Sequence, residues 1–393
     1  MKMERWKKNL YLCCVACFIV SVGMSQLAPM LPLYLVEMGM EDEAEITRWS
    51  GMIFGANFIS LAIAAPIWGR LSDKYGRKPM ALRASFWLGA IMVGFGLATS
   101  PEQLFALRLM QGAMSGFLGA VVPLVAQEAP KEKSGWALGI FFTFQVSGAL
   151  LGPLFGGWLV ELMGCRDVFF FVGGFCFVGF ASMFFVHESF TPVPHAAAVS
   201  FSKTFKMIPH PRRVVGIFTT TFLLHFSLTC VHPIITVYIA SLVPESEHVA
   251  LISGAVFSAT GVASALAGSP LGHLSDRVGP ERVMFVSLLL AGLSFLPQAF
   301  VTTPLELGAL RFIGGIAGAG LIPSTNSLIR QEVSDATLGR IFGLNQSAQF
   351  IGMFTGAFFG GWLAGALGIA SVFLIPGTLM LVAAVWFKTM TRK

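Results

Sequence analysis

Apolar stretches long enough to cross a membrane recur along the whole sequence and constrain its fold more than any other feature. A helix needs ~20 mostly apolar residues to span the ~30 Å hydrocarbon core of a bilayer. Only 12% of the residues are charged and 55% are hydrophobic, whereas soluble globular proteins carry roughly 25% charged residues. We expect twelve spanning helices, at approximately 9–36, 48–70, 79–98, 102–126, 135–161, 167–187, 213–242, 249–272, 282–301, 304–329, 338–364 and 369–388.

Lysine and arginine are distributed unequally between the turns that join these stretches. If both termini are cytoplasmic, 22 of the 26 basic residues lie on the cytoplasmic side, and only Arg48 and Arg166 lie on the other. Cytoplasmic loops of membrane proteins carry an excess of Lys and Arg. The distribution therefore predicts an even number of helices with both termini in the cytoplasm. It also explains the net charge of +6 without a nucleic-acid partner.

The sequence contains no recognisable motif of a disulfide-rich protein, a metal site, an ATP-binding protein or an enzyme. The six cysteines form no CxxC pair and no Cys/His cluster, so we expect neither a disulfide framework nor a metal site. Nothing resembles a Walker motif, so ATP is not an expected driving force. No nucleophile, base and orienting group can be assembled, which argues against an enzyme. The basic N-terminus superficially resembles a signal peptide, but its apolar run is long, and we interpret it as the first span.

The two halves of the sequence repeat one another. The charged stretch GRLSDKYGRKP at 69–79 recurs 203 residues later as GHLSDRVG at 272–279, and Arg108 and Arg311 have the same spacing. A glycine-rich run at 148–159 recurs at 352–363. Two six-helix halves in one orientation imply a pseudo-two-fold axis along the membrane normal, with a site between them near the midplane.

The longest polar interruption, from His187 to Arg213, separates the halves. We predict an N-terminal six-helix half at 1–190, a cytoplasmic linker at 191–212 and a C-terminal six-helix half at 213–393. The fold class is thus an all-α polytopic membrane protein with two pseudo-symmetric six-helix halves.

The sequence resembles the twelve-helix transporters of the major facilitator superfamily and, within it, the bacterial drug:proton antiporters of the MdtG-like kind. The segment from Trp49 through Arg83 and the run KSGWALG at 133–139 carry much of this similarity, which extends over essentially the whole chain. The resemblance implies multidrug efflux by a secondary transporter of the inner membrane, which works by alternating access through movement of its two halves. Its implied partners are small amphiphilic compounds, protons and the lipid bilayer, with a proton gradient in place of a cofactor and a monomeric state.

The charged stretch at 69–79 matches the cytoplasmic signature of this superfamily. Gly69 and Gly76 permit tight turning. The resemblance implies that Asp73 meets the N-terminal end of the helix at 338–364, where a carboxylate is favourable, with Arg340 adding an ion pair. A plain topogenic turn is the alternative. The proposed inner-gate residues are Gly69, Asp73, Gly76, Arg77, Lys78, Glu128, Arg340 and, in the second copy, Asp276.

Ion pairs are also expected beside this signature. The resemblance suggests that Arg77 bonds an acid at the inner end of the fourth helix, and Glu128 is the candidate. Arg282 with Glu332 would be the counterpart in the second half. There, Pro280 and Glu281 replace the basic pair of the first copy, so we expect a weaker inner latch on that side.

Arg108 lies inside an apolar run, where an arginine costs at least ~2.5–3.5 kcal/mol at the bilayer centre. It must therefore face the bundle interior, and Gln26 or the backbone near Pro29 is the expected partner. With Gln111 and Gly112 it resembles the helix-4 motif of the family, which implies proton coupling. A structural arginine that ties helix 4 to helix 1 is the alternative. The proton-coupling candidates are Arg108, Gln111, Glu37, His225 and His232; for the two histidines, buried hydrogen bonding is the alternative.

Five residues of the fifth helix resemble the antiporter motif: Gly148, Gly152, Pro153, Gly156 and Gly157. The glycines give a smooth face for close packing, and the proline bends the helix. The resemblance implies a seal between the halves that favours exchange over leak, and ordinary small-residue packing is the alternative.

Polar residues inside the spans are the substrate-cavity candidates: Gln26, Asn57, Gln145, His225, His232, Asn326, Asn345, Gln346 and Gln349. They lie among many Phe and Met residues, and Met side chains adapt to varied ligands. No carboxylate lies near the middle of a span, so strong selectivity for cationic drugs is not expected. The alternatives are an exporter of one solute such as a sugar, siderophore or metabolite, an uptake symporter, and a non-transporting receptor or scaffold.

Overall fold

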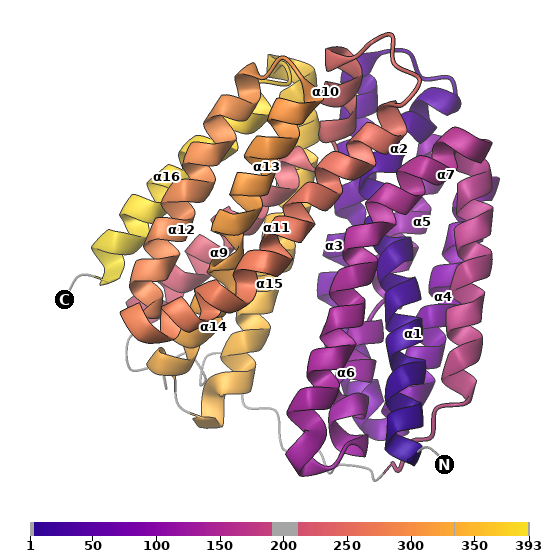
Figure 1. Ribbon diagram of the computed structural model, residues 1–393, viewed down its shortest axis with the longest axis vertical. Helices are drawn as coiled ribbons and strands as arrows, with labels where there is room; N and C mark the ends of the chain where they lie inside the picture. The colour runs from indigo at the N-terminus through magenta and orange to yellow at the C-terminus, as the bar shows by residue number, and fades with distance from the viewer. Residues whose placement is uncertain (1–3, 191–210, 334, 392–393) are drawn as a thin grey trace. The chain divides into compact units, whose positions relative to one another are not determined.

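The computed structural model describes residues 4–190, 211–333 and 335–391, and they are almost entirely helical (Figure 1). No strand occurs among them. The first half contains α1 Arg5–Ser25, α2 Leu27–Glu37, α3 Glu43–Tyr75, α4 Arg77–Leu97, α5 Pro101–Met114, α6 Phe117–Glu128, η1 Lys131–Lys133 and α7 Ser134–Phe184. The second contains α9 Pro211–Val231, α10 Ile235–Leu242, α11 Val249–Val278, α12 Pro280–Phe295, η2 Leu296–Phe300, α13 Pro304–Ala319, α14 Leu321–Glu332, α15 Asp335–Leu367 and α16 Ser371–Thr391.

In the part of the chain that the structure describes, 11 helical segments are long and apolar enough to span a membrane. One of them, Lys131–Phe184, has 54 residues and would be about 80 Å long at ~1.5 Å per residue. Gly164 interrupts it with φ 80 and ψ 164, which are not helical angles. The segment is therefore two spans, and the predicted all-α polytopic fold with twelve spans is confirmed.

Four of the expected continuous spans are broken near their middle. α1 gives way to α2 at Gln26, α5 to α6 before Gly116, α9 to α10 at 232–234, and α13 to α14 at Gly320. Local chemistry explains two of these breaks. Pro29 has no N–H to donate to the preceding turn, and Gly116 has φ 115, which glycine adopts readily.

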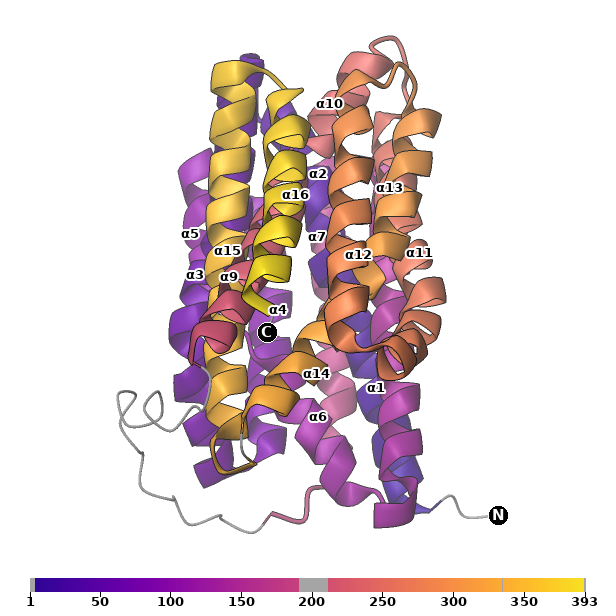
Figure 2. The ribbon, with the colours of Figure 1, turned by 90° about the vertical axis from the view of Figure 1, so that its left-hand side faces the viewer.

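The described residues form two compact units. Unit 1 comprises the described residues within Met1–Met40, Ala56–His195 and Glu247–Gly254, and unit 2 comprises those within Glu41–Gly55, Ala196–Ser246 and Ala255–Lys393. In unit 1, α7 packs against α1 and α4; in unit 2, α9 packs against α15 and α16 (Figures 1 and 2). Helices α3 and α11 each contribute residues to both units. The linker predicted at 191–212 lies almost wholly outside the described residues.

The sequence repeat is matched by repeated bonds inside each unit. In unit 1 the Tyr34 hydroxyl lies 2.7 Å from the carbonyl oxygen of Phe95 and 3.4 Å from that of Ala98. In unit 2 the Tyr238 hydroxyl lies 3.1 and 3.3 Å from the carbonyl oxygens of Gln298 and Val301. Each tyrosine thus fixes a short helix, α2 or α10, to the segment that ends the neighbouring span.

Candidate functional site

The signature stretch is mostly helical rather than a turn. α3 continues to Tyr75, and Gly76, with φ 98 and ψ 165, is the residue that reverses the chain. Gly69 lies within α3, and a Cβ added there would have nothing within 4 Å. The turn expected at Gly69 is therefore wrong, because the polar residues that follow it include no helix breaker before Gly76. Asp73 lies one turn before Arg77, with 3.8 Å between its Oδ1 and Arg77 Nη2.

Glu188, which the sequence did not indicate, accepts hydrogen bonds from the first residues of α4. The backbone N–H groups of Arg77 and Lys78 donate to Glu188 Oε1 and Oε2, at 2.7 and 2.9 Å. The Lys78 ammonium donates to the carbonyl oxygen of Phe184 at 2.7 Å. A helix N-terminus carries partial positive charge, and here two basic side chains add to it. Glu188 offsets this charge and satisfies two backbone donors at once.

Residues 187–189, which we call the strap, are fixed to two other helices as well. Asn9 of α1 exchanges two hydrogen bonds with the backbone of His187, at 2.7 and 3.0 Å. Glu128 of α6 accepts from the backbone N–H of Ser189 at 2.7 Å. Glu128 is therefore not the ion-pair partner that we expected for Arg77, because the strap contacts its carboxylate while Arg77 contacts Asp73 at the end of α3.

The corresponding end of unit 2 is built differently. Glu332 Oε1 lies 2.8 Å from Arg213 Nη1, so the partner is the arginine in the first turn of α9 rather than the expected Arg282. α12 starts with Pro280, which has no N–H to satisfy, followed by Glu281 in its first turn. Both residues suit a helix N-terminus, which gives a physical reason for their departure from the first copy.

The remaining predictions for the inner gate are not tested by these contacts. Asp276 and Arg340 are exposed side chains of unit 2. The approach of Asp73 to the N-terminal end of α15, the ion pair with Arg340 and the weaker second latch stay predictions.

Arg108 is buried in unit 1 with 2% of its surface exposed. Its Nη1 donates to Gln111 Oε1 at 2.5 Å, and Gln111 Nε2 lies 3.3 Å from the sulfur of Met24 on α1. The Gln26 amide is also buried, but neither of its polar atoms has a hydrogen-bond partner among the described residues. Gln26 is thus not the side chain that holds Arg108, whereas contact with the backbone near Pro29 stays a prediction. Gln111 connects the arginine to α1.

The helix that carries Arg108 approaches α3 closely through Gly112. A Cβ added at Gly112 would lie 2.9 Å from the carbonyl carbon of Asn57. In unit 2, Arg311 Nε donates to Thr260 Oγ1 at 3.2 Å, and a Cβ at Gly315 would lie 2.8 Å from Ala263 Cβ. The two units therefore repeat one pattern, in which a buried arginine and a glycine one turn later bring two helices together.

The two histidines of the seventh span have different surroundings. His225 is 6% exposed, and its Nδ1 lies 2.9 Å from the carbonyl oxygen of Thr221. His232 lies at the break between α9 and α10, where its ring is 5.9 Å from the ring of Phe54 and 5.8 Å from that of Phe257. The seven-residue spacing does not give them one shared environment, because the helix breaks at His232.

Glu37 ends α2 and accepts a hydrogen bond from the backbone N–H of Cys165 at 2.9 Å. Cys165 follows Gly164, the residue at which α7 bends. Glu37 therefore accepts a hydrogen bond from the first residue of the second span of α7. Its role in proton coupling stays a prediction.

The glycines of the fifth span serve two different contacts. A Cβ added at Gly148 or Gly156 would lie 2.8 Å from the Cβ of Ser21 or Gln26 on α1. Gly152 faces the same helix. Gly157 instead faces α11, where an added Cβ would lie 3.0 Å from Leu251 Cα. Small residues therefore allow close packing both within the first six spans and against the first turns of α11.

The same division occurs in unit 2. Gly352, Gly356 and Gly360 of α15 face α9, whereas a Cβ added at Gly361 would lie 3.1 Å from Gly51 Cα in the first turns of α3. Ordinary close packing accounts for three glycines of each run, and the fourth contacts a helix of the other half of the sequence.

The other substrate-cavity candidates are polar side chains of varied exposure. Gln346 and Asn326 are exposed, Gln145 and Gln349 are half-buried, and Gln346 Nε2 donates to Gln349 Oε1 at 3.1 Å. Asn345 is buried, and its Oδ1 has no hydrogen-bond partner among the described residues. Their contact with a substrate stays a prediction.

The sequence model described as Major Facilitator Superfamily matches residues 12–258 and 217–393. The chain belongs to this superfamily. Its similarity to named members extends over the full length. It is 38% identical over 393 residues to multidrug resistance protein MdtG of Proteus mirabilis, covering 99% of this chain and 98% of that protein. It is 36% identical to MdtG of Klebsiella pneumoniae, covering 99% and 94%.

Solved structures of other transporters have the same fold. A mutant of the nucleoside transporter NupG superposes with a TM-score of 0.79 at 18% identity, over 98% of this chain and 100% of that one. A bacterial homologue of the human lysosomal transporter Spinster, in an inward-facing and unoccupied conformation, gives 0.80 at 13% identity, over 99% and 98%. At such identities the likeness concerns the fold alone.

One further contact in this superfamily member was missed by sequence reasoning. Arg83, which we counted only as a topogenic cation, lies over the ring of Trp68 at 3.3 Å from its centroid. Its Nη2 donates to the carbonyl oxygen of Ser115 at 2.8 Å, and Trp68 Nε1 donates to that of Ala113 at 2.6 Å. The pair satisfies carbonyl groups released where α5 ends. A cation and an indole 15 residues apart gave no sequence signal for this.

Proposed function

We propose that this protein is a secondary active transporter that exports hydrophobic or amphiphilic compounds in exchange for protons, by alternating access. The observation that carries the proposal is the similarity over 99% of the chain to proteins named multidrug resistance protein MdtG. The repeated arrangement of buried arginine, close-packed glycine and broken spans supports it, because transporters build their sites at interrupted helices of two repeats.

The substrate class follows from the placement of acidic side chains. Among the described residues, Glu37 and Glu161 lie at the ends of their spans, and both receive backbone N–H groups there. A cation taken into a low-dielectric cavity needs an opposite charge to compensate for its lost hydration. The proposal therefore favours neutral or weakly charged amphiphiles over permanent cations.

His225 is the residue that we propose as the proton carrier. The group facing its Nδ1 is a carbonyl oxygen, which accepts hydrogen bonds but cannot donate them. Nδ1 therefore carries the hydrogen, and Nε2 is the nitrogen that remains able to take up a proton.

Transport by purified protein in liposomes tests this proposal. An imposed pH gradient should drive accumulation of an amphiphilic dye, and a proton-exchanging ionophore that collapses the gradient should abolish it. His225→Gln should bind the same dye but lose the response to the gradient. Accumulation that is unaffected by the ionophore would refute proton antiport, and absence of flux across a broad panel of amphiphiles would refute efflux.

The protein is a multi-pass membrane protein, and we propose that it lies in the inner membrane as a monomer with both termini in the cytoplasm. The excess of basic residues on one side supports this orientation. A green fluorescent protein fused after Lys393 should fluoresce, whereas alkaline phosphatase fused there should be inactive. Light scattering of the purified protein would test the monomer.

A further inference from the structure

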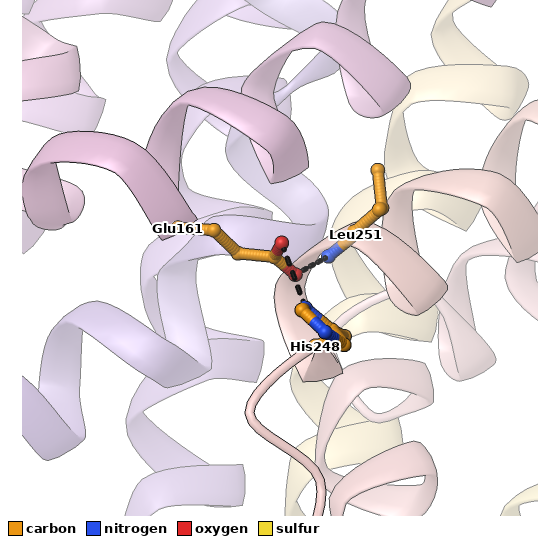
Figure 3. A network of polar contacts seen from close by, with 3 residues as sticks. All are labelled: Glu161, His248 and Leu251. Carbon is orange, nitrogen blue, oxygen red and sulfur yellow. Dashed lines mark hydrogen bonds and ion pairs between the residues drawn. The ribbon is translucent and has the colours of Figure 1, made fainter.

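The end of the fifth span carries an acid whose two oxygens both contact the start of α11 (Figure 3). Glu161 Oε1 accepts from the backbone N–H of Leu251 at 3.1 Å, and Oε2 lies 3.1 Å from His248 Nδ1. The Glu161 side chain is 17% exposed, whereas that of His248 is 69% exposed. The bond to the backbone is therefore the better shielded of the two.

This carboxylate supplies what the sequence of α11 lacks. α11 begins at Val249, so His248 is the residue that precedes its first turn and Leu251 is the third residue in it. Helices usually satisfy this N–H with a Ser, Thr, Asp or Asn at the preceding position. The first turn of α11 contains no acidic residue. Glu161 thus performs, from another helix, the task of a local cap.

The matching place in unit 2 has no such acid. The residue 204 positions after Glu161 is Gly365, which packs beside Ala44 and Arg48 of α3. α3 has its own cap, since the backbone N–H of Ala44 lies 3.2 Å from Asp42 Oδ1. Close packing of a glycine against the start of another helix therefore does not require a carboxylate that bridges the two helices. Only the contact in unit 1 has such an acid, Glu161.

α11 is also one of the two helices shared between the units. Its first residues, up to Gly254, belong to unit 1, and the rest belongs to unit 2. If α11 moves as one rigid helix with the rest of unit 2, its first residues must leave α7, and the bonds of Glu161 must then break.

We propose that Glu161, with His248 and Leu251, forms a releasable latch that holds the start of α11 on α7 and opens once in each transport cycle. Glu161 acts as a positioning residue, because its carboxylate provides the cap only while the two helices are together. This inference rests on the alternating access proposed above. Other charged groups near this place are Glu245 and Glu247 in the same loop, both exposed.

The latch can be tested without any substrate. Ala250 lies beside Gly157 and is 6% exposed, so a cysteine in its place should react with a large polar maleimide only when α11 leaves α7. All six native cysteines are buried, and the parent protein gives their background. In Ala250→Cys protein in nanodiscs, adding Glu161→Ala should raise the labelling rate by roughly 2- to 30-fold, the equivalent of a lost helix cap.

Two further variants separate the latch from a merely structural cap. Glu161→Gln keeps an oxygen for the Leu251 N–H and should raise labelling less than alanine does. His248→Ser gives α11 its own cap; added to Glu161→Ala, it should restore thermal stability but leave labelling fast. Glu306→Ala is the matched control, since Glu306 caps its own helix α13, and it should leave labelling at 250 unchanged.

Two results would overturn the latch: labelling that Glu161→Ala does not change, or labelling that His248→Ser returns to the parental rate. Because no transported compound is involved, these results are independent of the dye-flux measurements. A failure of efflux would refute the proposed function while leaving the labelling result to stand by itself.

Discussion

The hydrogen bonds between Glu188 and the start of α4, beside Gly76, allow a quantitative test of how the signature turn is built. Replacing Glu188 by alanine removes the acceptors of two backbone N–H groups at the start of α4. Loss of a helix cap costs ~0.5–2 kcal/mol, and these bonds involve a charged acceptor, so we expect a loss of about 1–2 kcal/mol in the free energy of unfolding. Denaturant titration of the purified protein in mixed micelles would measure it.

Gly76→Ala should be more harmful than the same change at Gly279. Both glycines have backbone angles that favour glycine, with φ 98 and φ 94, and we expect a strain of about 1–3 kcal/mol for alanine at either. At Gly76 the new Cβ would also lie 2.8 Å from Glu188 Oε2, whereas at Gly279 nothing lies within 4 Å. Gly279→Ala is therefore the matched control for backbone strain alone.

A double-mutant cycle isolates the part that belongs to the cap. In the Glu188→Ala background the added methyl group has no carboxylate to displace, so Gly76→Ala should cost about 1 kcal/mol less than in the parent, within the usual range for residues in contact. If the two substitutions are additive to within ~0.3 kcal/mol, the carboxylate does not hold this turn and the reasoning is refuted.

Other substitutions test single contacts by the same measurement. Arg213→Gln, which breaks a half-buried ion pair, should destabilise unit 2 by about 1 kcal/mol, whereas Arg282→Gln should stay within ~0.5 kcal/mol as exposed changes do. Gln26→Leu removes two buried polar atoms without partners and should leave stability unchanged or raise it by ~1 kcal/mol, while dye flux falls if this amide meets the substrate. Gly152→Leu should cost ~1–3 kcal/mol by overpacking, but Gly174→Leu, which faces open space, should be tolerated; equal effects would contradict the packing described for the fifth span.

The architecture was predictable because it depends on long stretches. Apolar runs of spanning length and a duplicated signature determine the number of helices and their pairing into halves, whatever the individual contacts are. The breaks within spans were harder to predict. Pro29 lies in an apolar run that is long enough to continue as one helix. Because Pro32 in the same run lies inside α2, the presence of a proline does not by itself show where a helix ends.

Partners across the fold were predicted least well, for a physical reason. Family resemblance points to charged side chains such as Arg77 and Glu128, but an acid can accept a hydrogen bond from a backbone N–H as readily as it can pair with a basic side chain. Backbone donors are present at every helix start and leave no mark in the sequence. Glu188 was therefore no candidate in the sequence, and Arg213 was counted only among the cytoplasmic cations, although each makes a bond that helps to hold its unit together.

The strap has a consequence for the order in which this protein is made. Chains are synthesised from the N-terminus, so α1 and α4 leave the ribosome long before residues 187–189 exist. Until then Asn9, the start of α4 and Glu128 all lack the partners that the strap gives them. The first six spans can be inserted one after another, but their ends are joined only when the sixth is complete. Until its last residues are made, the first half is thus without the contacts that join α1, α4 and α6 through the strap.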